Sequence, residues 1–215
     1  MKGLYRLAPL CSLLWVAVMA ASSAVHAQGT ISGIWRAERL QSQVLPVDPM
    51  FSAAGREAQN NFDTSVDPYL RCIVYMPRAM LAWAPTSIEI IQSEERVWVL
   101  FEAYHQVRRI FLDGRPPPEG VGATWLGHST GHWEGEVLVV ETTGLRAASY
   151  FWEGLPLSES TRLIERFTRL DEATLEVRMT VTDPVNYLEP WETRHVFSLH
   201  PDAHFYEYEC DRVVQ

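Results

Sequence analysis

The feature that most constrains the fold is the run from Thr174 to Thr182, in which polar and apolar side chains alternate strictly. Alternation with a period of two places one set of side chains on a buried face and the other set in water, which is the pattern of a β-strand. Leu163, Glu165 and Phe167 mark a preceding strand that reaches a turn near Asp171. Together the two segments predict an antiparallel hairpin.

Short apolar runs separated by turn residues recur from Thr86 to Cys210. They predict a single antiparallel β-barrel of about 8–10 strands, with a β-sandwich as the alternative. A barrel of this size has room inside for one small ligand. Ser52 precedes a helix-forming stretch at 53–58, so a short N-terminal helix capped by this serine is also expected.

The first 27 residues have the pattern of a signal peptide. Lys2 and Arg6 supply the positive start, an apolar run extends from Leu10 to Ala21, and Ala27 is a small residue suited to cleavage. The apolar run is shorter than the ~20 residues of a membrane-spanning helix. We therefore expect a periplasmic or secreted bacterial protein, with the mature β-domain at 28–215 and no membrane span.

Lys2 is the only lysine, so all fixed positive charges of the mature chain are arginines. The net charge of the full chain is −9 and becomes two units more negative when Lys2 and Arg6 leave. This acidity disfavours nucleic acid and anionic lipid as partners. No nucleotide, haem or flavin motif is present, so no cofactor is expected. Cys72 and Cys210 are expected to pair in an oxidising compartment, while two buried free thiols remain the alternative.

The segment 125–136 is dense in residues that carry chemistry. His128 and His132, with Glu134 nearby, offer a metal site as a weak alternative. In an extended strand the two histidines would be ~13 Å apart, so only a looped segment would bring them together. Gly127 to Gly131 also matches the nucleophile elbow of serine hydrolases, but a strand is expected after it where that motif needs a helix.

The segment 102–109 combines an acid, a phenol, an imidazole and two guanidinium groups. In one long strand, or in a hairpin turning near Tyr104 and His105, Glu102 and Arg108 come near the same surface. If that surface is the barrel interior, the charges must be paired or functional. A structural ion pair is the simpler interpretation.

Glu165 interrupts the otherwise apolar face formed by Leu163 and Phe167. A carboxyl group on a buried face has a raised pKa and can act as a general acid or base. The alternative is a carboxylate bound to a neighbouring arginine such as Arg108. Trp133 and Trp152 are expected on loops, where they would line a mouth for an apolar or aromatic ligand.

Several short motifs extend this picture along the chain. They are Pro77-Arg78-x-Met80, Asp113-Gly114-Arg115-x-Pro117, Trp125-x-Gly127-x-Ser129-x-Gly131-x-Trp133-Glu134-Gly135, Glu165-Arg166-Phe167-x-Arg169-x-Asp171, Asp183-Pro184-x-x-Tyr187-x-x-Pro190-Trp191 and Glu207-Tyr208-x-Cys210. Together they resemble a large family of secreted bacterial β-rich proteins, and Gly33-x-Trp35 is similar to the opening of lipocalin-like (calycin) barrels. The resemblance implies export, paired cysteines and a single β-domain, and it carries no activity.

We therefore expect an exported barrel that takes up a small apolar or aromatic molecule, with a preference for a cofactor-independent lyase, isomerase or hydratase. Glu165 would be the acid or base, His105 or His128 its proton partner, and Arg108 the group that holds a developing oxyanion. The expected substrate-binding residues are Glu102, Tyr104, Trp133, Trp152 and Tyr187. A non-catalytic carrier is the alternative, and metal-dependent hydrolysis through His128, His132 and Glu134 is a second alternative.

Overall fold

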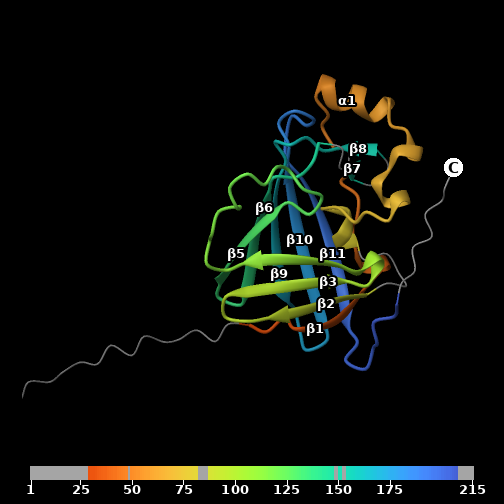
Figure 1. The fold of residues 1–215 in the computed structure, drawn as a ribbon. Helices are drawn as coiled ribbons and strands as arrows, with labels where there is room; N and C mark the ends of the chain where they lie inside the picture. Colours follow the sequence, from red (N-terminus) through yellow and green to blue (C-terminus); the bar gives the residue numbers. More distant parts are fainter. Residues whose placement is uncertain (1–28, 48, 82–86, 148–149, 152–153, 208–215) are drawn as a thin grey trace, which may run out of the picture.

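The computed structural model describes residues 29–47, 49–81, 87–147, 150–151 and 154–207. Nine strands form a closed barrel in the order β1-β11-β10-β9-β6-β5-β4-β3-β2 (Figure 1). The barrel strands are β1 (Gly33–Ala37), β2 (Ser87–Gln92), β3 (Arg96–Phe101), β4 (Gln106–Phe111), β5 (His128–Glu134), β6 (Val137–Thr143), β9 (Arg162–Arg169), β10 (Thr174–Thr182) and β11 (Trp191–Leu199). The prediction of a single β-barrel is confirmed.

The hairpin that the alternation predicted is formed by β9 and β10, which pair in antiparallel register with Glu165 opposite Met179. Directly opposite residues share one face of a sheet, so both side chains point into the barrel together with Leu163 and Phe167. The hairpin form of the segment 102–109 also holds, because β3 and β4 are antiparallel neighbours.

One pairing departs from the expected all-antiparallel pattern, since β4 and β5 run parallel to each other. Ile110 lies opposite Ser129 and Phe111 opposite Thr130. The connection between these strands, residues 112–127, contains the prolines at 116–118 and returns the chain to the end of the barrel from which β4 started. The strand β5 therefore enters from the same end as β4 and pairs with its last residues.

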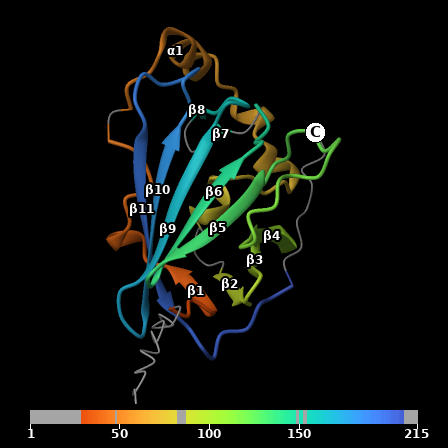
Figure 2. The same ribbon diagram turned by 90° about the vertical axis from the view of Figure 1, so that its left-hand side faces the viewer.

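Residues 49–81, here called the cap, cover the end of the barrel at which β6 ends and β9 begins. In Figures 1 and 2, α1 and the small β7–β8 sheet lie beyond this same end, which is at the top of Figure 1. The elements outside the barrel are η1 (Arg39–Gln41), α1 (Ala53–Asn60), η2 (Thr64–Val66), η3 (Pro68–Arg71), η4 (Arg78–Leu81), η5 (Ala103–His105), β7 (Tyr150–Phe151) and β8 (Leu155–Pro156). The predicted N-cap is present, because the Ser52 side chain accepts a hydrogen bond from the Gly55 N–H. Within the described ranges, no helix has the length and apolar character needed to cross a membrane.

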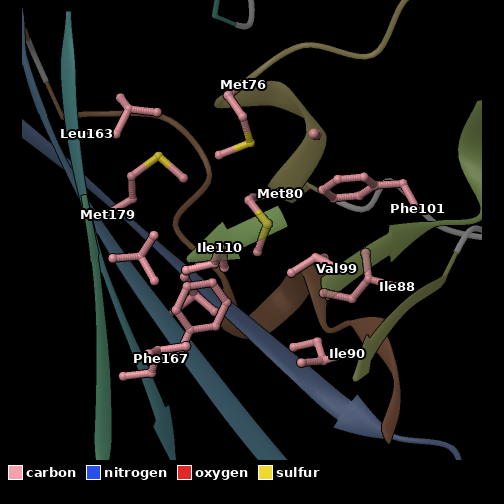
Figure 3. Close-up of a cluster of buried hydrophobic side chains, with 14 of the residues drawn as sticks. Met76, Met80, Ile88, Ile90, Val99, Phe101, Ile110, Leu163, Phe167 and Met179 are labelled. Carbon is pink, nitrogen blue, oxygen red and sulfur yellow. The ribbon is translucent and has the colours of Figure 1, made fainter. Parts of the chain in front are cut away.

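The hydrophobic core fills the barrel interior beneath the cap. Met76 and Met80 come from the cap and lie in one cluster with Phe101, Ile110 and Met179 from the barrel wall (Figure 3). Both cap methionines are fully buried. Methionine is unbranched and adaptable, so these side chains match an irregular cap to the regular wall.

Truncation of Met80 tests the packing of the cap against the barrel. Met80→Ala removes a fully buried side chain, and we expect it to lower the free energy of unfolding by about 2–5 kcal/mol. Leu70→Ala is the matched control in the same cap, because Leu70 is 53% exposed, and it should change stability by about 0.5 kcal/mol or less. Urea denaturation measures both values. Equal effects of the two substitutions would contradict the packing described here.

Candidate functional site

A buried ion pair between Arg108 and Glu165 lies inside the barrel. Arg108 projects inward from β4 and Glu165 from β9, and their exposed fractions are 1% and 0%. The guanidinium donates from Nη1 to Glu165 Oε1 over 2.9 Å, and from Nη2 to Glu165 Oε2. Both carboxylate oxygens are therefore occupied by one arginine in a two-pronged geometry.

Two hydroxyl groups complete this polar cluster. Arg108 Nε donates to Ser129 Oγ over 3.1 Å, and Nη2 donates to Thr142 Oγ1 over 2.7 Å. The two hydroxyl oxygens are 2.9 Å apart and share a hydrogen bond. Ser129 and Thr142 lie opposite each other on β5 and β6, the two strands between β4 and β9 in the barrel. The guanidinium thus follows the inner wall across four strands, with acceptors from each strand it crosses.

Ser129 therefore has a role that differs from that of a nucleophile. It is the central residue of the elbow-like motif from Gly127 to Gly131. It lies within β5, and the strand β6 follows where a nucleophile elbow needs a helix, as the sequence predicted. Its hydroxyl is 2% exposed and bound to Arg108 and Thr142. The sequence pointed to Arg108 and Glu165 but not to Ser129 and Thr142. Ser129 is two residues from Gly131 and Thr142 is two residues from Val140, and this spacing placed both hydroxyl groups on the inner face of their strands.

Glu102, Tyr104 and His105 lie outside this cluster. Glu102 is buried and accepts hydrogen bonds from the backbone N–H groups of Ser87 and Tyr206, so it joins the start of β2 to the C-terminal segment. Tyr104 donates to the Tyr69 carbonyl over 3.2 Å and attaches the β3–β4 turn to the cap. His105 is exposed. The structure places none of these three side chains against Glu165.

The histidines of β5 point away from the barrel interior. His128 Nε2 lies 2.9 Å from the Arg115 carbonyl oxygen, and its ring stacks on Phe111. His132 contacts Glu134 at 3.3 Å on the exposed surface, and Glu134 also pairs with Arg166. The strand is extended over these residues, so the two histidines are separated by ~13 Å. Across the part of the chain that the structure describes, no group of three histidine, cysteine, aspartate or glutamate side chains is placed to hold a metal ion.

The aromatic residues expected at a mouth are distributed differently. Trp133 is half-buried near the end of β5 and packs against the core. Tyr187 is buried, packs between Phe51 and Trp191, and donates its hydroxyl hydrogen to the Pro156 carbonyl over 3.0 Å. Burial raises the pKa of Tyr187 above its ordinary value. Tyr187 thereby attaches β8 and the cap to the barrel.

Three sequence predictions concern residues that are not described. Trp152, Cys210 and the segment 1–27 all lie outside the described ranges. Cys72 is half-buried and ends η3 in the left-handed backbone region, at φ 61°. The pairing of Cys72 with Cys210 stays a prediction.

A second polar group inside the barrel was not anticipated. His195 and Thr193 project inward from β11, with exposed fractions of 1% and 2%, and His195 Nε2 lies 2.9 Å from Thr193 Oγ1. Burial lowers the pKa of His195 to about 4, so the imidazole is neutral at pH 7. The sequence contained a signal for this position. Thr193 and His195 lie at every second residue between Trp191 and Phe197, so all four side chains share the inner face of β11.

Comparison of the chain with models of protein families and with curated proteins found no match. Its function must therefore be argued from the geometry of the two interior polar groups.

Substitution of Glu165 tests the energetics of the ion pair. Glu165→Gln leaves a buried guanidinium without its counter-charge, and we expect a loss of about 3–5 kcal/mol in the free energy of unfolding. The double variant Arg108→Met/Glu165→Met removes both charges and should recover most of that loss. Urea denaturation of the two variants gives the comparison. A double variant less stable than Glu165→Gln would mean that the cluster stabilises the fold in some other way.

The buried imidazole makes stability depend on pH. Between the pKa of His195 in the unfolded chain, about 6.5, and its folded value of about 4, only the unfolded chain binds the extra proton. The contribution of neutral His195 to the free energy of unfolding is therefore fully present above pH 6.5. It falls by about 3 kcal/mol as the pH drops toward 4. His195→Gln should lose this portion of the pH dependence, as measured by urea denaturation at pH 7 and pH 4. His132→Gln is the control at a histidine that is 66% exposed, and its pH dependence should match the wild type.

Proposed function

We propose that the chain is an exported β-barrel that binds one small, neutral, largely apolar or aromatic molecule in the barrel interior beneath the cap. The proposal is supported by the Arg108 cluster and the His195–Thr193 pair in an interior that is mainly lined by apolar side chains. Sites for small molecules commonly combine an apolar lining with a few placed polar groups that fix orientation. Export and the Cys72–Cys210 disulfide belong to the same proposal and rest on the sequence.

The single observation that carries the proposal is the hydrogen-bonding state of Arg108. A guanidinium has five N–H donors. Among the described residues, four of the donors of Arg108 have acceptors, which belong to Glu165, Ser129 and Thr142. A buried donor without a partner costs about 1–3 kcal/mol. The remaining N–H of Nη1 is therefore suited to an oxygen atom of a bound molecule.

Charge selects the kind of oxygen. Arg108 and Glu165 neutralise each other, so an added carboxylate would be buried without a counter-charge of its own. A carbonyl or hydroxyl oxygen accepts the hydrogen bond without that cost. The ligand is then a neutral molecule with one such oxygen on an apolar or aromatic body.

The cap supplies the route of entry. Among the described residues, two hydrogen bonds join 68–81 to the barrel region. The Met76 N–H donates to the Trp125 carbonyl over 2.9 Å, and the Tyr104 hydroxyl donates to the Tyr69 carbonyl over 3.2 Å. Met76 and Met80 add apolar contacts with the interior. A ligand that displaces these adaptable side chains would make the same kind of contacts in their place.

The geometry favours an anchoring role for Glu165 over acid–base chemistry, because Arg108 occupies both of its oxygens. His105 and His128 lie outside the cluster, so neither is placed as its proton partner. Binding is thus better supported than catalysis by Glu165, and a non-catalytic carrier shares the same binding site. The metal-dependent alternative gains no support from the positions of His128 and His132.

A matched pair of aromatic probes tests the role of the Arg108 cluster. 1-Acetylnaphthalene and 1-ethylnaphthalene have similar shapes, and only the first has a carbonyl oxygen. Each is titrated against the fluorescence of bound N-phenyl-1-naphthylamine. We expect the preference for the acetyl compound to fall about tenfold or more in Arg108→Met/Glu165→Met, because a hydrogen bond to a charged group contributes about 1.5–3 kcal/mol.

Arg115→Met is the matched control, since Arg115 is an exposed arginine paired with Asp113, and its preference should equal that of the wild type. Two results would overturn the proposal. One is the absence of saturable binding of N-phenyl-1-naphthylamine to the wild type. The other is an unchanged acetyl-over-ethyl preference in the double variant.

A further inference from the structure

His195 and Thr193 form a second polar group on the inner wall, which the anchoring role of Arg108 does not use. Their side chains share the barrel interior with Val177 and Met179, which lie directly opposite them on β10. The ionised side chains of this part of β10 and β11 lie on the outer face. Glu176 pairs there with Arg178 and Arg194, and Glu192 accepts a hydrogen bond from Thr180. The imidazole is therefore set in an apolar surrounding with Thr193 as its hydrogen-bond partner among the described residues.

The strand register fixes the spacing between the two polar groups. Glu165, Met179 and Thr193 are directly opposite one another on β9, β10 and β11. Opposite residues of antiparallel strands have Cα atoms ~5 Å apart, so the Cα atoms of Glu165 and Thr193 are separated by ~10 Å. The two polar groups therefore lie on the same inner wall, and a ligand bound against this wall can lie next to both. Met179, between the two groups, gives that ligand an adaptable apolar wall.

The hydrogen bond to Thr193 involves Nε2 of His195, so the other ring nitrogen, Nδ1, is the one available for proton transfer. Burial keeps the ring neutral at pH 7, because the pKa is lowered to about 4. In the tautomer in which Nε2 donates its hydrogen to Thr193 Oγ1, the lone pair of Nδ1 is free to accept a proton. Both oxygens of Glu165 already accept hydrogen bonds from Arg108, so this carboxylate serves as the counter-charge of the guanidinium.

We propose that His195 is the general base, and then the general acid, for a neutral unsaturated ketone whose carbonyl oxygen is bound by Arg108. This inference rests on the proposed function and names its substrate class and reaction. In the first step Nδ1 takes a proton from the carbon next to the carbonyl. The C–H electron pair becomes a carbon–carbon double bond, and the carbonyl π pair moves onto the oxygen, where the Arg108 N–H stabilises the enolate.

In the second step the imidazolium returns the proton to the far carbon of the extended enolate. The carbonyl forms again, and the carbon–carbon double bond is now conjugated with it. The proton that leaves one carbon reaches another, so the atoms and electrons balance without an oxidant, a reductant or a cofactor. The reaction is the isomerisation of a β,γ-unsaturated ketone to its α,β-unsaturated isomer.

Allyl 1-naphthyl ketone is the probe, because its conjugated product is followed by ultraviolet absorbance. Competition with N-phenyl-1-naphthylamine first measures its binding. We expect the wild type to accelerate isomerisation above the buffer rate, and His195→Gln to lose about 100-fold or more of that acceleration, with affinity for the ketone unchanged within about twofold. His132→Gln, at the exposed histidine of β5, should retain the full rate.

Folding of each variant is checked by urea denaturation, and His195→Leu, which fills the apolar site, replaces His195→Gln if the latter does not fold. A ketone that binds to the wild type but isomerises at the buffer rate would overturn the role of His195, as would a wild-type rate in either His195 variant. In that outcome the binding function stands. Failure of the ketone and of N-phenyl-1-naphthylamine to bind would overturn the proposed function itself.

Discussion

The buried ion pair between Arg108 and Glu165 is the constraint on which the rest of the barrel depends. The two residues belong to β4 and β9, and β5 and β6 separate these strands in the sheet. A shift of one residue in any of the four strands would move a charge or a hydroxyl group from the inner to the outer face. A shift in β4 or β9 would also leave a buried charge without its partner, which is far more costly than a lost apolar contact. The cluster therefore constrains the register of the four strands β4, β5, β6 and β9.

The sequence predicted the parts of this arrangement that depend on local periodicity. The alternation in Thr174–Thr182 located β10. Glu165 interrupts an otherwise apolar face, and this marked Glu165 as a candidate functional residue. The hydroxyl groups that bind Arg108 could not be identified in this way. Ser129 and Thr142 belong to β5 and β6, and the position of these strands beside β4 depends on the parallel β4–β5 pairing. His195 was missed since β11 mixes polar and apolar residues on its inner face, which weakens the alternation. Within the cap, the sequence predicted the helix α1 with Ser52 as its N-cap. It did not predict the 3₁₀ turns η2, η3 and η4, because these short turns have no sustained period.

The motifs that carried the resemblance gain a physical explanation at the joint between cap and barrel. Asp183 is buried and accepts hydrogen bonds from Ser158, Thr161 and Asn186, so it joins the end of β10 to the segment before β9. Burial alone would raise the pKa of Asp183, but these hydrogen bonds outweigh it and keep the pKa below its ordinary value. Arg78 pairs with Asp67 within the cap. These contacts hold the upper end in place around the interior polar groups.

The charge balance of the interior connects binding to chemistry. The cluster of Arg108 and Glu165 is neutral as a whole, and His195 is neutral at pH 7, so the described interior favours a neutral ligand at rest. In the proposed isomerisation, a proton would move from the ligand to His195, leaving a negative oxygen near Arg108 and a positive imidazolium near Thr193. In a surrounding of low dielectric constant, these two new charges attract each other across the ligand more strongly than they would in water. Arg108 would then have two anionic neighbours, with Ser129 and Thr142 holding the guanidinium in its position. A preorganised cation of this kind stabilises developing charge without reorienting.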